Sequence, residues 1–480
     1  VYGFYQEQLD QKHLLDFGDL IFKSVVLLQT HVDVRDEIRR TYRHTLVDEY
    51  QDVNRASAVL LRGIAGAGQG LWVVGDMRQS IYRFRGASPS NVRLFGDDFP
   101  GARVFTLERN YRSQPKIVDT FAELVPHLQA AQGEKFTPWQ KHRADAGGQV
   151  LMEIADDPVA EGKGLAREIQ RRHAAGIPYH DQAVLCRSHT ALARIAAVLE
   201  QSGVPILYFG DLFERPEVRD LLALLSLACE GDGRGLVRVG GFREYDIPLA
   251  DTLHLLDLAR AQNVPFPRAL ALARDAEGIS RRGKSGLALL ASHLDGISYG
   301  TNSWGLLVHY IFGRSVYLRD LLRDTTVPGQ QQRLALYQFL QFAHERRSAP
   351  VVAGVDPKRA FLQYVRRLEV FGDERQLRQM PECATRMDAV RLLTVHASKG
   401  LEFRAVYLPG LARGSFPARR QHQPCPPPTG MLLDDTGNGH EEEEECLFLV
   451  ALSRARDHLC LSRPSRPGGQ PTNPSGLLTW

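Results

Sequence analysis

The sequence predicts an α/β protein in which parallel sheets alternate with helices and a mainly helical domain is inserted. Short apolar runs that end in polar or glycine residues recur along the 480 residues, and segments with apolar spacing of three and four separate them. Short, β-branched runs suit strands buried on both faces of a parallel sheet, whereas the three-and-four spacing suits helices packed on that sheet. Alternation of the two is typical of α/β architecture.

The order of these segments predicts the elements one by one. The predicted strands are 45–48, 71–76, 104–107, 183–186, 392–395, 405–408 and 459–461. The predicted helices among them are 56–64, 117–128, 191–201 and 217–228. From about residue 231 to 384 the pattern is mostly helical, which predicts an insertion between two parts of one α/β domain.

Length and composition exclude several classes of protein. At roughly 150 residues per domain, the chain of 480 residues suggests about three domains. Its 43% hydrophobic and 24% charged residues are ordinary for a globular protein, and no apolar run approaches the roughly 20 residues of a membrane span. No secretory signal is visible, so we expect a cytoplasmic protein with no membrane partner. The net charge of +3 is too small to indicate nucleic-acid binding by itself.

The six cysteines are scattered along the chain, and no two of them form a C-x-x-C pair. This pattern favours reduced thiols over a disulfide framework. The histidines and cysteines between 422 and 460 match no compact zinc or iron–sulfur spacing, so we expect no metal cluster there.

Two acids, Asp48 and Glu49, follow the predicted strand 45–48. Ligands of open α/β sheets bind at the carboxyl ends of the strands. There one acid can hold Mg²⁺ on phosphate oxygens while the other orients or deprotonates a water. A lone acid pair is a weak signal because surface acids are common, but the apolar run before it and Gln51-Asp52 after it add weight.

A second predicted strand, 71–76, is followed by a segment in which aromatic residues and arginine alternate. This segment contains Gln79, Tyr82, Phe84 and Arg85. Aromatic rings interleaved with arginine suit base stacking with phosphate contacts, as in single-stranded nucleic-acid binding. The alternative is that Tyr82 and Phe84 are core residues.

Taken together, these motifs resemble those of the superfamily 1A (UvrD/Rep-type) DNA helicases. Residues 44–52 and 73–87 resemble motifs II and III of that family, and segment 16–21 resembles the stretch before motif II. Further matches follow in family order: motif IV at 107–113, motif V at 390–403 with 410–417, and motif VI at 442–457. The resemblance implies two RecA-like parallel-sheet domains of the P-loop NTPase class. It also implies ATP and Mg²⁺ as cofactors, and single-stranded DNA and single-strand/duplex junctions as partners.

The resemblance also implies roles for individual residues of the nucleotide site. Asp48 would be a ligand of Mg²⁺, Glu49 would activate the attacking water, and Gln79 would sense the γ-phosphate. Arg112 and Arg454 would reach the γ-phosphate, Arg454 as the arginine finger. Tyr111 would stack on adenine and Glu402 would contact the ribose. The residues implied for single-stranded DNA are Tyr82, Phe84, Arg85, Thr394, His396 and Lys399.

The sequence departs from the family pattern at a few positions. Phe84 stands where many relatives have Trp, Glu445 and Cys446 stand where two basic residues are usual, and Leu449 replaces a common Tyr. The run 441–445 is therefore unusually acidic. We expect it to be a solvated helix start, which the helix dipole favours.

No segment before Asp48 resembles the phosphate-binding loop G-x-x-x-x-G-K-[ST]. A literal match, 278–285, lies in the helical insertion. A working loop follows a strand and opens a helix, whereas the residues before this match read as a helix, so Lys284 is not assigned a catalytic role. We therefore expect a first RecA-like domain that is incomplete, a chain that lacks its N-terminal segment, and a fragment that is inactive by itself.

By resemblance the chain divides into five parts: 1–110 as the rest of the first RecA-like domain, 111–230 and 385–465 as the second, 231–384 as the helical insertion, and 466–480 as a tail. The implied function is an ATP-dependent 3′–5′ DNA helicase, driven by lobe closure, in DNA repair or recombination with partner proteins of those pathways. Two alternatives stay open: a helicase–nuclease subunit of the RecB/AddA kind, and a catalytically inactive DNA-binding scaffold.

Overall fold

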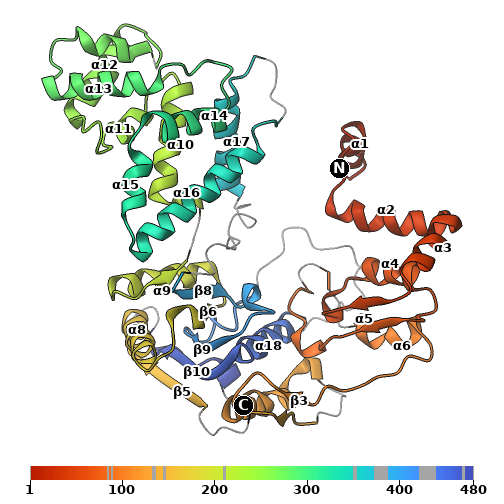
Figure 1. Cartoon of the computed structure of the whole chain (residues 1–480). Coiled ribbons are helices and arrows are strands. Elements are labelled where there is room, and N and C mark those ends of the chain that lie inside the picture. The colour runs from red at the N-terminus through yellow and green to blue at the C-terminus, as the bar shows by residue number, and fades with distance from the viewer. Residues whose placement is uncertain are drawn as a thin grey trace. The chain divides into compact units, whose positions relative to one another are not determined.

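The computed structural model describes most of the chain (Figure 1). The described residues are 2–83, 86–87, 90–131, 137–143, 148–208, 212–266, 268–349, 354–371, 387–420, 439–466 and 471–478. The chain forms two compact units, one made of Val1–Val204 with Val390–Trp480 and the other of Pro205–Ala389.

The first unit contains a large parallel sheet (Figure 1). Its strands in this unit lie in the order β5-β10-β9-β6-β8, and all their recorded pairings are parallel. Their bounds are β5 (Gln149–Ala155), β6 (Gln182–Cys186), β8 (Val390–Thr394), β9 (Phe403–Leu408) and β10 (Ala455–Pro464). All residues of β6 are buried, as expected for a central strand covered on both faces. The predicted α/β class with parallel sheets is confirmed.

Helices pack on both faces of this sheet. Helices α8 (Pro158–Ala174) and α9 (His189–Gln201) contact each other and the strands, and α7 (Pro115–Leu124) and α18 (Gly439–Leu452) meet β10 together. Helix α8 begins after Asp157, whose carboxylate accepts hydrogen bonds from two main-chain N–H groups of its first turn. That capping satisfies donors that the helix itself leaves open.

A smaller parallel sheet carries the first of the sequence motifs. It consists of β1 (Thr45–Val47) and β2 (Leu71–Val73), beside helices α2 (Phe17–Thr30), α3 (Val32–Thr41) and α4 (Arg55–Ala65). A core that includes Tyr50, Leu61 and Phe99 packs against it. In contrast Leu46 is 79% exposed and Trp72 is 63% exposed. The prediction that these two strands are buried on both faces was wrong, because no described element covers their second face.

The predicted strand 104–107 was also wrong. Val104, Phe105 and Leu107 are exposed and belong to no strand. No described strand pairs with them; the chain instead forms the short β3 (Arg109–Asn110), which pairs with β4 (Gln140–Lys141). The other α-helices among the described residues of the first unit are α1 (Tyr2–Gln11), α5 (Ser90–Arg93) and α6 (Phe95–Asp98).

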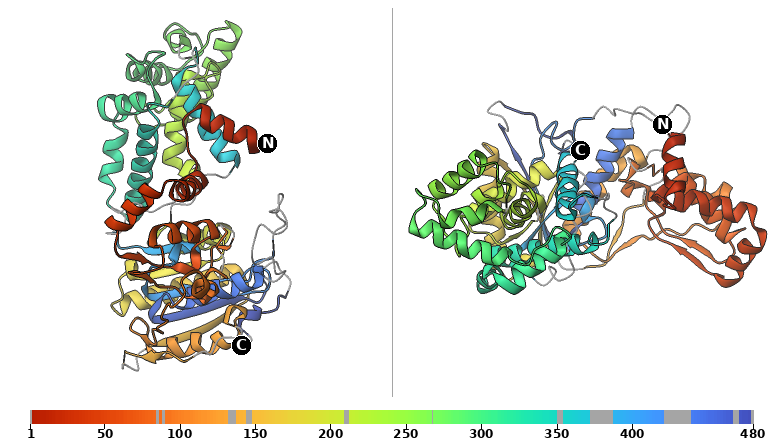
Figure 2. Two further views of the ribbon diagram at one scale, coloured as in Figure 1. Left: turned by 90° about the vertical axis from the view of Figure 1, so that its right-hand side faces the viewer. Right: turned by 90° about the horizontal axis from the view of Figure 1, so that it is seen from above.

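The second unit is mainly helical (Figures 1 and 2). After β7 (Ile206–Leu207) it contains α10 (Pro216–Cys229), α11 (Gly235–Val239), α12 (Leu249–Ala261), α13 (Arg281–Leu294), α14 (Ser303–Val308), α15 (Tyr317–Arg323), α16 (Val327–Glu345) and α17 (Pro357–Phe371). Helix α10 contacts α11, α16 and α17 and supplies Leu221, Leu224 and Leu225 to their core. The compact unit starts at Pro205. How these units map onto the domains of the family stays a prediction.

One lysine of the second unit is almost completely buried. The side chain of Lys358, in the first turn of α17, is 1% exposed and lies 3.1 Å from Asp356 Oδ1. Its Nζ also donates to the carbonyl oxygens of Ser298, Tyr299 and Thr301 at 3.0 to 3.1 Å. The ammonium group therefore holds the 298–301 loop against the start of α17.

We expect Lys358→Met to destabilise the second unit by about 3–5 kcal/mol, because Asp356 and three carbonyl groups would lose a buried cationic partner. Urea unfolding of the protein, followed by a probe in this unit, measures the loss. The matched control is Arg359→Met, which changes an exposed neighbour on the same helix. Equal stability of the two variants would contradict a structural role for the buried ammonium group.

Candidate functional site

The acid pair lies directly after β1. Asp48 is exposed, and its Oδ1 accepts a hydrogen bond from Glu49 N at 2.8 Å. Glu49 adopts the left-handed conformation, with φ 53° and ψ 44°. This conformation is costly for a residue other than glycine, and such strain gathers at functional sites. After this turn the main chain continues into the 3-10 helix Tyr50–Asp52.

A buried amide, that of Gln51, joins the ends of β1 and β2. Its Nε2 donates to the Glu49 carboxylate, and its Oε1 accepts from Asp76 N at 2.9 Å. A Cβ atom on Gly75 would lie 2.8 Å from Gln51 Oε1, so this approach requires glycine. Sequence reasoning assigned Gln51 no role of its own; its place just after the acid pair was the only signal.

Gln79 lies close to the same edge. It ends the 3-10 helix Met77–Gln79, which Asp76 caps by accepting from Arg78 N. Gln79 Nε2 donates to Asp76 Oδ2 at 3.0 Å, and Arg78 Nε donates to Asp76 Oδ1 at 2.8 Å. Asp76 therefore holds the predicted γ-phosphate sensor, a contact that the sequence did not indicate.

Lys399 of motif V reaches motifs II and III. Its Nζ lies 2.6 Å from Asp52 Oδ2, 3.3 Å from Glu49 Oε2 and 2.9 Å from the main-chain oxygen of Gln79. Burial raises the pKa of Asp52, while the hydrogen bond and charge of Lys399 lower it and the charge of Glu49 raises it. Acids of the nucleotide motif thus surround the ammonium group of Lys399, which was predicted to contact DNA.

The other residues predicted to bind DNA divide into two sets. The Tyr82 hydroxyl donates to the main-chain oxygen of His396 at 3.2 Å, and their rings lie 6.1 Å apart. Thr394 ends β8, and its Oγ1 accepts from Ala397 N at 3.3 Å. These residues are brought together, whereas Phe84 and Arg85 lie outside the described residues.

Motif IV docks on the start of β10. Asn110 Oδ1 accepts from Arg112 N and Ser113 N, at 3.0 and 2.9 Å, and the Ser113 hydroxyl donates to Ala455 O at 2.6 Å. Arg112 Nε then donates to Glu402 Oε2 at 2.8 Å. The predicted γ-phosphate arginine and the predicted ribose contact therefore form one ion pair.

Arg454 is turned inward. It is 3% exposed, and it donates from Nε to Val450 O at 3.0 Å and from Nη1 to Leu401 O at 3.3 Å. Burial, together with the neighbouring charge of Arg112, lowers the pKa of Arg454 to about 10, while Glu49 and Glu402 act in the opposite direction. In this conformation two main-chain carbonyl groups and the Ser453 hydroxyl, which accepts from Nη2 at 2.8 Å, satisfy its guanidinium group.

Tyr111, the predicted adenine-stacking residue, is 63% exposed. Its ring lies 4.5 Å from the imidazole of His142, with a 48° angle between the planes. His142 follows β4, so this aromatic pair depends on the β3–β4 pairing. No motif in the sequence indicated a role for His142.

The acidic run at the start of α18 is not a solvated helix start, so that prediction was wrong. Glu444 is 1% exposed and lies 2.6 Å from Arg187, and Glu445 is 8% exposed and accepts from Gln129 N at 2.8 Å. Glu442 pairs with Arg83 at 2.5 Å. Each of these acids has a partner from a distant segment, and the pairing compensates for its burial.

The sequence match to a phosphate-binding loop has a different setting in the structure. A 3-10 helix, Arg268–Arg274, precedes it rather than a strand, and Ser280 caps α13 through Gly283 N at 3.0 Å. The carboxylate of Asp251, which is 6% exposed, accepts from Ser280 N at 3.1 Å. A buried negative charge therefore already lies at this helix N-terminus and would repel phosphate.

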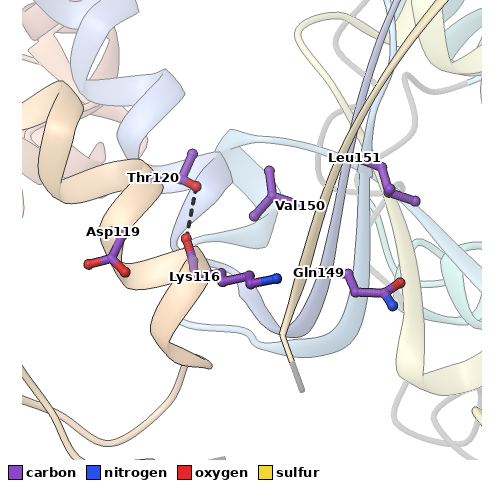
Figure 3. Close-up of a pocket in the computed structure, with 6 residues that line it drawn as sticks. All are labelled: Lys116, Asp119, Thr120, Gln149, Val150 and Leu151. Atoms are coloured by element: carbon purple, nitrogen blue, oxygen red, sulfur yellow. Dashed lines mark hydrogen bonds between the residues drawn. The ribbon is translucent and has the colours of Figure 1, made fainter. Parts of the chain in front are cut away.

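A surface pocket of about 490 Å³ lies between α7 and β5 (Figure 3). Its lining residues are Lys116, Asp119, Thr120, Gln149, Val150 and Leu151. None of the predicted site residues belongs to this pocket.

Within the described ranges, no three His, Cys, Asp or Glu side chains gather as a metal site, and no helix is long and apolar enough to span a bilayer. The exposed carboxylate of Asp48 fits Mg²⁺ nonetheless, because this ion commonly uses one or two protein carboxylates and takes its other ligands from water and phosphate.

Family comparisons agree with the motif order. The family model described as the UvrD/REP helicase N-terminal domain matches residues 1–100, and the UvrD-like helicase C-terminal domain matches 105–251 and 351–466. The chain belongs to the UvrD/Rep helicase family. The resemblance inferred from the motifs is thereby confirmed.

Individual relatives of the UvrD/Rep family support this placement. ATP-dependent DNA helicase UvrD1 of Mycobacterium leprae is 32% identical over 96% of this chain and 60% of its own length. ATP-dependent DNA helicase PcrA of Bacillus subtilis is 28% identical over the same shares, and ATP-dependent DNA helicase Rep of Escherichia coli is 28% identical over 95% of this chain and 65% of its own length. The chain thus spans about 60% to 65% of the length of these relatives.

Burial raises the pKa of the Glu443 carboxyl group in α18 to about 7. The folded protein therefore holds this proton more tightly than the unfolded chain, and the stabilisation is lost as the pH rises from 4.5 to about 7. We expect Glu443→Gln, which cannot ionise, to stabilise the protein by about 1–3 kcal/mol at pH 8 and to have little effect near pH 4.

Thermal unfolding of wild type and variant over this pH range measures the difference. Glu441→Gln is the control, since Glu441 is exposed on the same helix. A stability difference for Glu443→Gln that does not change with pH would contradict the prediction.

Proposed function

We propose that this chain contains the hydrolytic acids, the arginines and part of the DNA path of an ATP-driven DNA helicase. The supporting observation is the convergence of motifs II, III and V on Glu49, Asp52 and Gln79 through Lys399. Phosphoryl transfer needs mainly the positioning of the reacting groups and the stabilisation of charge. This cluster of acids, an amide and a cation can provide both.

For the nucleotide, we assign Asp48 to Mg²⁺ and Glu49 to the attacking water. When bound, Mg²⁺ offsets the charge of the phosphate oxygens. The exposure of Asp48 and the fixed turn at Glu49 are compatible with these roles. Gln79, held by Asp76, is placed to report the γ-phosphate to the neighbouring DNA motif.

The arginines would act after a rearrangement. Arg112 is engaged by Glu402, and Arg454 by main-chain carbonyl groups. A γ-phosphate offers the Arg454 guanidinium group a stronger partner than a neutral carbonyl does, and it would compete with Glu402 for Arg112. We infer that nucleotide draws both arginines out, which couples ATP binding to closure of the two lobes. Tyr111 would then stack on adenine while Glu402 contacts the ribose.

For DNA, the aromatic and polar cluster of Tyr82, Thr394 and His396 is the proposed single-strand contact, together with Phe84 and Arg85. Base stacking on aromatic rings tolerates any sequence, which suits a translocating enzyme. Movement in the 3′–5′ direction, unwinding at single-strand/duplex junctions, and a role in repair or recombination belong to the same proposal. The names of the relatives support only the general statement that those proteins are ATP-dependent DNA helicases.

One observation supports the alternative of an inactive DNA-binding scaffold. The single G-x-x-x-x-G-K-S match in the 480 residues lies at α13, where Asp251 opposes phosphate. We therefore propose that the 480-residue chain does not turn over ATP by itself.

Single-strand-stimulated ATP hydrolysis, measured for the 480-residue chain and for the full-length protein, tests the proposal. We expect the full-length protein to hydrolyse ATP and Glu49→Gln to lose that activity, while Lys284→Ala leaves it unchanged. Activity abolished by Lys284→Ala would instead make 278–285 the phosphate loop. A full-length protein that binds DNA without hydrolysing ATP would favour the scaffold.

We expect Arg454→Ala to lower ATP turnover in the full-length protein by about 10³-fold or more, because an arginine finger stabilises charge in the transition state. The dissociation constant for single-stranded DNA without nucleotide should stay within about twofold, since the arginine acts on phosphate transfer. Steady-state hydrolysis and fluorescence anisotropy measure the two quantities. Unchanged turnover would remove the finger assignment.

A further inference from the structure

We propose that Lys399 is a positioning residue of the hydrolytic site, which holds Glu49 and Asp52 together, rather than a contact for DNA phosphate. The inference rests on the proposed ATPase function and adds to it a residue from the second RecA-like domain. It assigns a new role to a lysine that motif resemblance alone would place on the DNA.

Burial is the first observation. The Lys399 side chain is 6% exposed. Lysines that bind nucleic-acid phosphate act as solvated, flexible charges that exchange counterions with the solvent. A nearly buried ammonium group can stay charged only where partners compensate for its lost hydration, and such partners are present here.

The partners match the capacity of the ammonium group. Three oxygen atoms lie within 3.3 Å of Nζ, from Asp52, Glu49 and the main chain of Gln79. An ammonium group has three N–H donors, so a DNA phosphate would have to displace one of these oxygens. The ring of Tyr82 lies 5.4 Å from Nζ and covers a further side.

The charge of Lys399 lets two acids share one small volume. Asp52 is partly buried, and the negative charge of Glu49 acts against its ionisation. Lys399 contacts both carboxylates and offsets their repulsion. Without it, Glu49 would turn away from Asp52, and a water-activating group displaced by about 1 Å can lose about 10²-fold in rate.

Lys399 also belongs to the segment that carries the proposed DNA contacts. It directly follows the 3-10 helix His396–Ser398, and the main-chain oxygen of His396 accepts from the Tyr82 hydroxyl. A strand of DNA that shifts His396 would therefore shift Lys399, and with it Glu49. This connection gives single-stranded DNA a physical route to stimulate hydrolysis.

The first test separates positioning from DNA binding in the full-length protein. We expect Lys399→Met to lower kcat at saturating single-stranded DNA by about 10²-fold, with the nucleotide-free DNA dissociation constant within about twofold. Lys163→Met, on an exposed lysine of α8, is the control and should change neither. A weaker DNA affinity with a salt slope reduced by about 1, and an unchanged kcat, would overturn the proposal in favour of a phosphate contact.

A double variant tests the charge balance directly. Asp52→Asn removes the second negative charge, so Asp52→Asn combined with Lys399→Met should recover at least about tenfold of the kcat lost in Lys399→Met. Lys399→Arg, which keeps the charge, should retain more activity than Lys399→Met. A double variant no faster than Lys399→Met would overturn charge balance as the role of Lys399.

A second readout does not need hydrolysis at all. The ion pair between Asp52 and Lys399 requires an ionised Asp52. The charged groups that act on Asp52 are Glu49 and Lys399. The melting temperature of Lys399→Met should therefore fall below that of wild type at neutral pH, and the gap should narrow as Asp52 becomes protonated at acid pH.

The kcat measurements and the melting temperatures distinguish a failure of the proposed function from a failure of the proposed ion pair. A wild-type protein without ATPase activity would end the proposed function, and the pH dependence of the melting temperature would then decide on the ion pair alone. A gap between Lys399→Met and wild type that is absent, or the same at every pH, would overturn the ion pair.

Discussion

The side-chain amide of Gln51 fixes the distance between the ends of β1 and β2. It is fully buried, donates to Glu49 and accepts from the main chain of Asp76. A buried amide must satisfy both ends, so the two strand ends cannot drift apart without a desolvation cost of about 1–3 kcal/mol. The left-handed turn at Glu49, the glycine at position 75 and the cap on Gln79 all follow from this one bridge.

In the larger sheet, hydrogen bonds to the main chain position motif IV in a similar way. Motif IV is held through Ser113, which donates to the main-chain oxygen at the start of β10, and through Gln114, whose main-chain N–H donates to Arg456 O. The arginine that precedes Ser113 is thereby aimed at Glu402. Polar side chains near the nucleotide motifs are thus positioned mostly by main-chain hydrogen bonds, which a rigid parallel sheet supplies in a fixed geometry.

The sequence could predict features that depend on neighbours along the chain. The runs before Asp48 and within 182–186 became strands, and the segments around α9 and α10 became helices, because local apolar spacing decides those elements. The family followed from five motifs in order. The strand expected at 104–107 failed because a strand needs a partner, which local pattern does not reveal.

The remaining errors and omissions have one physical cause, which is contact between distant segments. The acids of α18 look solvated in sequence, but Arg83, Gln129 and Arg187 reach them from elsewhere in the first unit. Asp251 likewise meets Ser280 across 29 positions. A motif match shows which residue types are present, whereas the fold determines which charged groups lie close to each other.

The face of the β1–β2 sheet that no described element covers affects how the 480-residue chain would behave in solution. Leu46, Trp72 and Val74 are more than half exposed, with Phe105 and Leu107 also exposed. Exposed apolar patches of this kind favour association and the binding of hydrophobic dyes. Handling this chain by itself would therefore call for low protein concentration or a mild detergent. The indole of Trp72 would report any molecule that covers this face through a change in its fluorescence.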